Sequence, residues 1–122
     1  MNIYKCEICG TTVEEITFGV SHPSCCGQLM TPVKAGTTDG AKEKHVPVVK
    51  VEGNKVEVKI GEVEHPMAEE HYIEWIAIET TNGMQRKCLK PGQAPKAEFL
   101  LADGETLVAT YDYCNIHELW KA

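Results

Sequence analysis

The chain has 122 residues, enough for one ordinary domain and a small accessory module but too few for two full hydrophobic cores. Hydrophobic residues make up 43% of it and charged residues 25%, as in soluble globular proteins, and no apolar run approaches the roughly 20 residues that span a bilayer. A formal net charge of −6 without a cluster of Lys and Arg argues against a nucleic-acid partner.

The first 36 residues contain four of the six cysteines. Cys6 and Cys9 form a Cys-x-x-Cys pair, and Cys25 and Cys26 follow after fifteen residues. No apolar export segment opens the chain, so we expect a cytoplasmic protein whose thiols stay reduced and bind metal. Two such pairs predict a tetrahedral site of four thiolates. Residues 1–36 can scarcely bury a core, so metal binding should be part of the folding free energy of this module.

Two alternatives remain for the four-cysteine module. The adjacent residues Cys25 and Cys26 cannot form the usual Cys-x-x-Cys knuckle, so the site should be distorted from zinc-ribbon or rubredoxin-type geometry. A structural zinc site without a redox role is one alternative. A redox-active disulfide between Cys6 and Cys9 is a weaker one, because no βαβ pattern follows this pair.

The rest of the chain has the pattern of an all-β domain. Residues 33–44 are small, polar and glycine-bearing, which predicts a linker that becomes a functional loop. From His45 onward no segment shows a sustained helical period, and Asn82-Gly83 is the strongest short hairpin signal. The expected strands include residues 46–51, 56–60, 72–80, 84–89, 97–102 and 106–111, the last two forming a hairpin. About seven short strands predict an immunoglobulin-like β-sandwich in residues 37–122.

A second group of metal-binding residue types lies at the expected strand ends and loops. Cys114 and His117 are three residues apart and can reach one ion from a tight turn. His45, His65 and His71 stand beside turn-forming or strand-ending residues, where a rigid sandwich can position them. Four imidazoles and one thiolate exceed the usual four ligands of zinc and suit a redox metal with one open coordination position.

The other histidine and cysteine are expected to have structural roles. His22 lies between the two cysteine pairs without a partner at ligand spacing. Cys88 occupies a strand position, and we expect a small buried apolar residue rather than a reactive thiol. The connection between His65 and His71 has room for one helical turn before the next strand begins.

Together these motifs resemble the desulfoferrodoxins, a family of two-iron superoxide reductases. Residues 1–36 resemble desulforedoxin, and residues 37–122 resemble the neelaredoxin domain. The resemblance covers nearly the whole chain and rests on an ordered set of motifs: Cys6-x-x-Cys9, Cys25-Cys26, the segments 39–47, 65–67, 71–75 and 89–92, and the turn 113–117.

The resemblance implies two iron ions per chain, one of them held by the four N-terminal cysteines. It implies these ligands for the second, catalytic iron: His45, His65, His71 and His117, with Cys114 as the axial thiolate. Glu43 and Lys44 would lie on a mobile loop over the open sixth position, and Glu43 could bind there when the iron is ferric. The implied reaction reduces superoxide by one electron to hydrogen peroxide. A homodimer is implied as well, and a rubredoxin-like electron donor is expected.

Electrostatics explains how an acidic protein could attract an anionic substrate. Ferrous iron with one thiolate keeps a net positive charge, so neutral imidazoles would surround a cationic spot. Lys44 adds a second positive charge at its rim, and together the two charges can steer superoxide to the open position, an effect that falls as salt rises.

Three alternative functions remain open. A cupredoxin-like electron carrier would require a methionine shortly after the C-terminal histidine, whereas residues 118–122 contain none. A structural zinc protein would need no redox metal. Dismutation of superoxide is a close mechanistic alternative, and it would release oxygen as well as peroxide.

Overall fold

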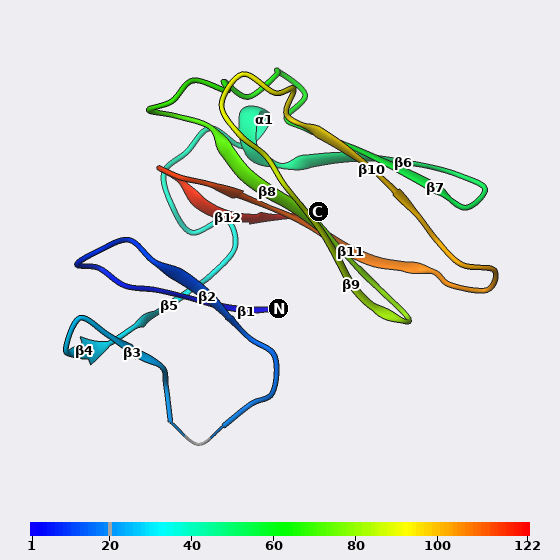
Figure 1. Ribbon diagram of the computed structural model, residues 1–122. Helices are drawn as coiled ribbons and strands as arrows, with labels where there is room; N and C mark the ends of the chain where they lie inside the picture. The colour runs from blue at the N-terminus through cyan, green and yellow to red at the C-terminus, as the bar shows by residue number, and fades with distance from the viewer. Residues whose placement is uncertain (20) are drawn as a thin grey trace. The chain divides into compact units, whose positions relative to one another are not determined.

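The computed structural model describes residues 1–19 and 21–122, which divide into two compact units, Met1–Lys34 and Ala35–Ala122. Strands form nearly all of the regular structure in the described residues (Figure 1). The helix among them, α1 (Lys42–His45), is a single turn at the end of the segment that the sequence predicts as a functional loop. No helix in these ranges has the length and apolar character needed to cross a bilayer.

The N-terminal unit consists of a three-stranded antiparallel sheet and a two-stranded hairpin, in blue and cyan in Figure 1. In the sheet β1 is the central strand. The strands are β1 (Asn2–Lys5), β2 (Thr12–Glu15) and β5 (Thr31–Val33) in the sheet, and β3 (Ser24–Cys25) and β4 (Gln28–Leu29) in the hairpin. The buried cluster of this unit consists of Tyr4, Cys6 and Met30, with Val13 packed against it. So few buried side chains contribute little hydrophobic free energy, which leaves room for a metal to stabilise the unit.

The hairpin explains how two adjacent cysteines can face one site. Its two connecting residues, Cys26 and Gly27, have φ angles of 52° and 77°. Two successive residues with positive φ form a type I′ turn, whose twist matches that of the flanking strands. Glycine adopts this region without steric cost, whereas Cys26 is a non-glycine residue held there. The turn leaves the sulfur atoms of Cys25 and Cys26 3.9 Å apart.

The C-terminal unit is a β-sandwich of seven strands in two antiparallel sheets, coloured green to red in Figure 1. One sheet has the order β10-β7-β6 and the other the order β12-β11-β8-β9. The strands are β6 (Pro47–Glu52), β7 (Lys55–Ile60), β8 (Ile73–Thr80), β9 (Gly83–Cys88), β10 (Lys96–Leu100), β11 (Leu107–Cys114) and β12 (Glu118–Lys121). The prediction of an all-β chain with a seven-stranded sandwich is confirmed.

The strand pairing corrects one expectation from the sequence. The predicted hairpin between residues 97–102 and 106–111 is wrong, because β10 pairs with β7 whereas β11 pairs with β8 and β12. The intervening segment crosses from one sheet to the other. Each strand carries apolar residues on the face that it buries, but this alternation does not specify which neighbouring strand it joins. The short strand β12 was also not expected.

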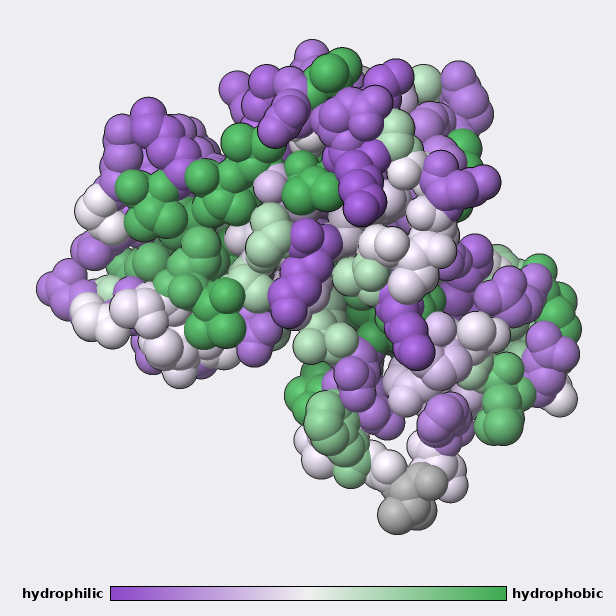
Figure 2. Space-filling view, turned by 180° about the vertical axis from the view of Figure 1, so that it is seen from behind, coloured by the Kyte–Doolittle hydropathy of each residue, from purple (hydrophilic) through white to green (hydrophobic). Residues whose placement is uncertain are grey.

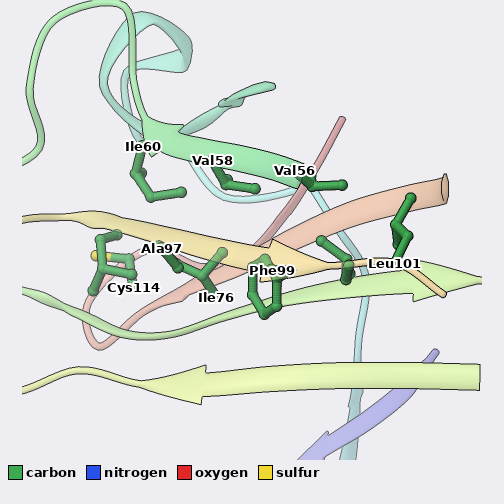
Figure 3. Close-up of a cluster of buried hydrophobic side chains, with 10 residues drawn as sticks. Val56, Val58, Ile60, Ile76, Ala97, Phe99, Leu101 and Cys114 are labelled. Carbon is green, nitrogen blue, oxygen red and sulfur yellow. The ribbon is translucent and has the colours of Figure 1, made fainter. Parts of the chain in front are cut away.

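The hydrophobic core lies between the two sheets. Its members come from β7, β10 and the residue after β10 on one side and from β8 and β11 on the other, and Figure 3 draws ten of them. They are Val56, Val58, Ile60, Ile73, Ile76, Ile78, Ala97, Phe99, Leu101 and Cys114. Full burial of an aliphatic side chain of this size contributes roughly 1.5–3 kcal/mol. Cys114 lies at one end of the row in Figure 3, so a thiol belongs to the core itself.

Figure 2 shows one face of the molecule, on which several hydrophobic side chains adjoin one another in a patch bordered by hydrophilic ones. Cys88 is exposed, so the expectation of a buried residue is wrong. It ends β9, the edge strand of its sheet, where most residues on both faces of the strand are exposed. A strand at an edge lacks a neighbour on one side, and a sequence pattern alone does not show where a strand lies in its sheet.

Candidate metal centres

The four cysteines of the N-terminal unit lie together. The sulfur atoms of Cys6, Cys9, Cys25 and Cys26 are all within 4.8 Å of one another. Those of Cys9 and Cys25 are 3.6 Å apart, and those of Cys25 and Cys26 are 3.9 Å apart. Four sulfurs bound tetrahedrally through bonds of about 2.3 Å would stand about 3.8 Å from each other. The observed separations therefore fit a single shared ion.

This four-cysteine group is partly open to solvent. Cys6 is buried and Cys25 is half-buried, whereas Cys9 and Cys26 are exposed. A hydrogen bond with the Thr11 hydroxyl lowers the pKa of Cys9 to about 6, while hydrogen bonds with Cys6 and Cys9 raise the pKa of Cys25 to about 12. The four sulfurs therefore do not all ionise together at neutral pH unless a cation binds among them.

In the C-terminal unit a second group of donors comes from five segments of the chain. His45 ends α1, His65 follows the turn after β7, and His71 directly precedes the segment that enters β8. Cys114 ends β11, and His117 lies in the connection to β12. The possible ligand atoms of His45, His65, His71 and Cys114 lie within 4.8 Å of one another. The structure thus brings together residues that are up to 69 positions apart along the chain, from His45 to Cys114 (114 − 45).

His117 joins this group through its Nδ1 atom. That nitrogen lies 3.1 Å from Nε2 of His45 and 4.0 Å from the sulfur of Cys114. The backbone N–H of His117 also donates a hydrogen bond to the Cys114 sulfur over 3.4 Å. The turn between the two residues therefore presents a thiol and an imidazole to the same point.

Backbone carbonyls orient two of the imidazoles. Nδ1 of His45 lies 2.7 Å from the carbonyl of Ala41, and Nδ1 of His65 lies 2.7 Å from the carbonyl of Pro66. A carbonyl can only accept, so each Nδ1 carries the proton and each Nε2 keeps a free lone pair. These two Nε2 atoms are 3.2 Å apart. Two lone pairs directed at each other are unfavourable unless a cation lies between them.

His71 gives an independent indication of a missing partner. Its Nε2 is buried, and no hydrogen-bond partner is found for it among the described residues. Buried polar nitrogens are rarely left unpaired, so this atom calls for a ligand such as a metal ion. Imidazole nitrogens bound to one ion through bonds of about 2.1 Å stand roughly 3.0–3.4 Å apart for angles between square and tetrahedral. The separations of 3.1 and 3.2 Å at His45 fit that range.

The second group is buried at the thiol and more open at two of the imidazoles. Cys114 is fully buried in the core, and His45 and His65 are only 2% and 1% exposed. His71 and His117 are half-buried. Burial lowers the pKa of His65 to about 4 and raises the pKa of the Cys114 thiol. The His65 imidazole is thus kept neutral and able to bind a cation, and a bound cation would favour ionisation of the thiol.

The expected connection between His65 and His71 differs from the structure. The connection has room for one helical turn, but an isolated bridge between Ala68 and His71 closes a tight turn instead. The backbone N–H of each residue donates to the carbonyl of the other, over 3.0 and 3.1 Å. This reciprocal pair positions His71 immediately before the strand.

Trp120 and residues 38–40 hold His117 in place. The carbonyl of His117 accepts hydrogen bonds from the Thr38 hydroxyl at 2.6 Å and from Nε1 of Trp120 at 3.0 Å. The Trp120 ring also stacks on His45, with centroids 4.8 Å apart and an interplanar angle of 26°. A Cβ on Gly40 would lie 2.9 Å from the His117 side chain, so only glycine fits there without displacement. One tryptophan therefore contacts two of the five donors.

Asn115 connects the C-terminal turn to the segment that carries His71. Its Oδ1 accepts a hydrogen bond from the backbone N–H of Tyr72 at 2.9 Å, and its Nδ2 donates to the carbonyl of Glu70 at 3.1 Å. These two residues flank His71, while Asn115 itself follows Cys114. The amide side chain thus fixes the separation between the thiol and that imidazole.

Glu43 and Lys44, the residues that the resemblance places over the open position, differ in what they face. The charge of Lys44 lowers the pKa of His45 and His71, although burial is the larger cause in both cases. Lys44 therefore lies within electrostatic reach of the donors. Glu43 is exposed and lines a surface hollow of about 420 Å³ with Val46 and Glu62. In the part of the chain that the structure describes, its carboxylate does not belong to the group of ligand atoms.

Sequence reasoning missed the residues that support the donors, among them Trp120, Asn115 and Gly40. It also missed Asp112, a fully buried carboxyl group with no hydrogen-bond partner among the described residues. Burial raises the pKa of Asp112 well above its ordinary value, and the charge of Asp112 contributes, after burial, to raising the pKa of the Cys114 thiol. A lone acidic residue within an apolar strand was the one visible signal. His22, expected to be structural, lies against the Tyr4 ring, with the two ring centroids 5.3 Å apart.

Comparison with known proteins assigns the whole chain to one family. The family model described as Desulfoferrodoxin matches residues 37–122, and the model described as Desulfoferrodoxin, N-terminal domain, matches residues 1–33. A desulfoferrodoxin homolog from Archaeoglobus fulgidus is 51% identical over 122 residues, which cover 100% of this chain and 96% of that protein. The desulfoferrodoxin of Nitratidesulfovibrio vulgaris is 48% identical over 120 residues, covering 98% of this chain and 94% of that one.

The fold is also found in a solved structure. The crystal structure of the superoxide reductase from Treponema pallidum matches with a TM-score of 0.81 and 36% sequence identity, covering 98% of each chain. The two family models follow one another along the chain, and full-length relatives are about half identical to it. Both findings agree with the two groups of donors described above. The chain therefore belongs to the desulfoferrodoxin family.

Proposed function

We propose that this chain is a superoxide reductase, with an iron held by the five donors of the C-terminal unit. The observation that carries the proposal is their convergence: four imidazoles and one buried thiol point to a common place, and His71 has an unpaired buried nitrogen there. A structure that matches over nearly the whole chain is that of a superoxide reductase. In the proposed reaction superoxide takes up one electron and two protons and becomes hydrogen peroxide.

The iron, when bound, supplies the electron that reduces superoxide. His45 and His65 are oriented for it by the carbonyls of Ala41 and Pro66, which keep their protons on Nδ1. Cys114 is shielded from water by the core, so its sulfur would bind the metal from a low-dielectric side and, once ionised, would donate charge to it. Access for a small anion is left at the half-buried His71 and His117.

Lys44 is proposed to handle the charge of the substrate. Its ammonium group lies within electrostatic reach of His45 and His71, on a chain whose net charge of −6 would otherwise repel an anion. A local positive charge raises the encounter rate with superoxide and can supply a proton through water from Nζ. We also propose that Glu43 becomes a sixth ligand when the iron is ferric. Its exposed position at the surface hollow means that it must turn to reach the site.

The four-cysteine group is proposed to hold a second iron that relays electrons, with residues 1–36 as a module separate from the catalytic sandwich of residues 37–122. Its sulfur separations of 3.6 and 3.9 Å support one tetrahedral ion. Its partial exposure suits exchange of electrons with a carrier. We propose a rubredoxin-like protein as that carrier, a homodimer as the assembly and the cytoplasm as the location.

Two other functions predict different metals. A cupredoxin-like carrier would use a single copper and leave two of the four histidines without a role, and a structural zinc protein would not change its visible spectrum on reduction. Metal analysis of anaerobically purified protein, combined with visible spectra before and after reduction, separates the three. Two irons per chain with distinct ferric spectra are expected. Zinc or copper as the sole metal would exclude the proposal.

A further inference from the structure

The turn that carries Lys44 packs against a second turn, formed by residues 61–64, which leads directly to His65. We call these the Lys44 turn (Lys42–His45) and the Gly61 turn. The backbone N–H of Val63 donates to the carbonyl of Glu43 at 3.0 Å, and that of Gly61 donates to the carbonyl of Val46 at 3.2 Å. Figure 1 shows α1 beside the loop that leaves β7. Backbone hydrogen bonds thus join the Lys44 turn to the Gly61 turn, which leads to the proposed metal ligand His65.

Gly61 makes this close approach possible. It is buried, its φ is +84°, and a Cβ added to it would lie 2.7 Å from the carbonyl oxygen of Lys44 and 2.8 Å from the carbonyl carbon. The same Cβ would lie 2.3 Å from the carbonyl oxygen of Val63. All three atoms belong to the backbone, so none can move aside as the end of a side chain could. Any other residue here must push the two turns apart.

The glycines in other turns of the sandwich do not have this property. Gly104 has nearly the same backbone conformation, with φ +81°, but a Cβ there would meet nothing within 4 Å. Gly53, in the hairpin between β6 and β7, is likewise free of contacts at that position. Position 104 therefore favours glycine for its backbone conformation alone. Position 61 favours glycine both for its backbone conformation and for the close approach of the Lys44 backbone.

We propose that Gly61 is a positioning residue of the superoxide site, which clamps the Lys44 turn to the Gly61 turn and so sets the place of the Lys44 ammonium relative to His65. The inference rests on the proposed role of Lys44. The Lys44 turn is then not a freely mobile loop but is held in two ways. The backbone N–H of Val46 closes its C-terminal end by donating to the carbonyl of Lys42 at 2.9 Å, and the Gly61 turn binds the carbonyl of Glu43. Gly61 touches neither substrate nor metal and acts through Lys44.

A double-mutant cycle tests this directly in the iron-loaded full chain. Gly61→Ala is measured alone and combined with Lys44→Ala, and Gly104→Ala serves as the control with matched φ. We expect Gly61→Ala to lower the second-order rate constant for superoxide about tenfold and to weaken its ionic-strength dependence. Gly104→Ala should change both by less than about twofold. In the Lys44→Ala background, Gly61→Ala should add less than about twofold, because the group through which it acts is gone.

A full additional loss in the Lys44→Ala background would overturn the proposal, since Gly61 would then act on something other than Lys44. Amide hydrogen exchange of unmodified protein gives a second test that holds even if Gly61→Ala fails to fold. Peptides covering residues 61–64 should exchange at least about 100-fold more slowly than an unstructured segment. Unprotected exchange there would overturn the clamp. If the unmodified protein does not reduce superoxide, the proposed function fails, whereas the exchange measurement still decides the clamp.

Discussion

The two groups of metal-binding residues differ in how much of the fold supports them. The four cysteines come from two tight turns, one of these cysteines belongs to a buried cluster of only three residues, and two of them are exposed. The donors of the C-terminal unit come from five segments, and Cys114, His45 and His65 are almost completely buried. Trp120 and Asn115 brace several of these donors in addition. The first group should therefore depend on its ion for its shape, whereas the second is pre-organised by the sandwich.

The largest effect is expected from removing one cysteine ligand, which should unfold the N-terminal unit and leave the C-terminal unit intact. Cys9→Ser should abolish the tetrahedral site and leave residues 1–34 without stable structure, because their core is too small to fold alone. Hydrogen exchange of peptides from this unit should accelerate at least about 100-fold, while peptides from β7 and β8 keep their protection. Superoxide reduction at the second iron should stay within about twofold of the unmodified protein. If superoxide reduction were lost together with the structure of the N-terminal unit, the four-cysteine site and the catalytic site would not have separable roles.

The next effect concerns the charge at the open side of the catalytic group. Lys44→Ala should slow the second-order reaction with superoxide about tenfold and weaken its dependence on ionic strength, because the local attraction is removed. Stopped-flow or pulse-radiolysis kinetics at several salt concentrations measures both. Lys96→Ala, which removes the same charge from an exposed position on β10, is the matched control. An unchanged rate constant and salt slope in Lys44→Ala would exclude this role.

A smaller effect is expected from the tryptophan that braces two donors. Trp120→Phe keeps a ring against His45 but removes the Nε1 donor to the carbonyl of His117. Loss of one such hydrogen bond should weaken metal retention at the catalytic group about fivefold, which competition with a chelator can measure. Trp75→Phe, at the other tryptophan, provides the comparison. Equal metal retention in Trp120→Phe and the unmodified protein would mean that this hydrogen bond does not position His117.

The smallest kinetic effect is expected at Glu43. Glu43→Ala should leave the first encounter with superoxide within about twofold, because the carboxylate lies at a surface hollow away from the ligand atoms. If the carboxylate becomes a ligand in the ferric state, the visible spectrum of the oxidised protein should change. An identical ferric spectrum would count against Glu43 as a ligand.

The donors and the strands were within reach of the sequence because local chemistry reveals them. The Cys-x-x-Cys pair is recognisable by its spacing, the histidines beside turns are recognisable only together with the Cys114–His117 turn, and the alternation of residues 56–60 lies within β7. The partners of these elements were not predictable in the same way. Apolar alternation marks the buried face of β10 and β11 but not the sheet that each joins.

The supporting residues were missed for a related reason. Gly61 and Lys44 are seventeen positions apart, and nothing in either sequence neighbourhood shows that their backbones touch. Trp120 lies in a strand that was not expected, so its stacking on His45 could not be foreseen. The exposure of Cys88 depends on the order of strands in the sheet. Such contacts arise only when segments distant in the sequence fold together, whereas a ligand motif consists of residues that are close in the sequence.

The product balance of the reaction tests the central claim most directly. Anaerobic, fully reduced protein is given a known amount of superoxide, below one equivalent of catalytic iron, and both peroxide and oxygen are measured. A reductase forms one hydrogen peroxide for each superoxide consumed and releases no oxygen, with oxidation of a matching amount of iron. One peroxide and one oxygen for every two superoxide ions, with the iron still reduced at the end, would identify a dismutase and contradict the account.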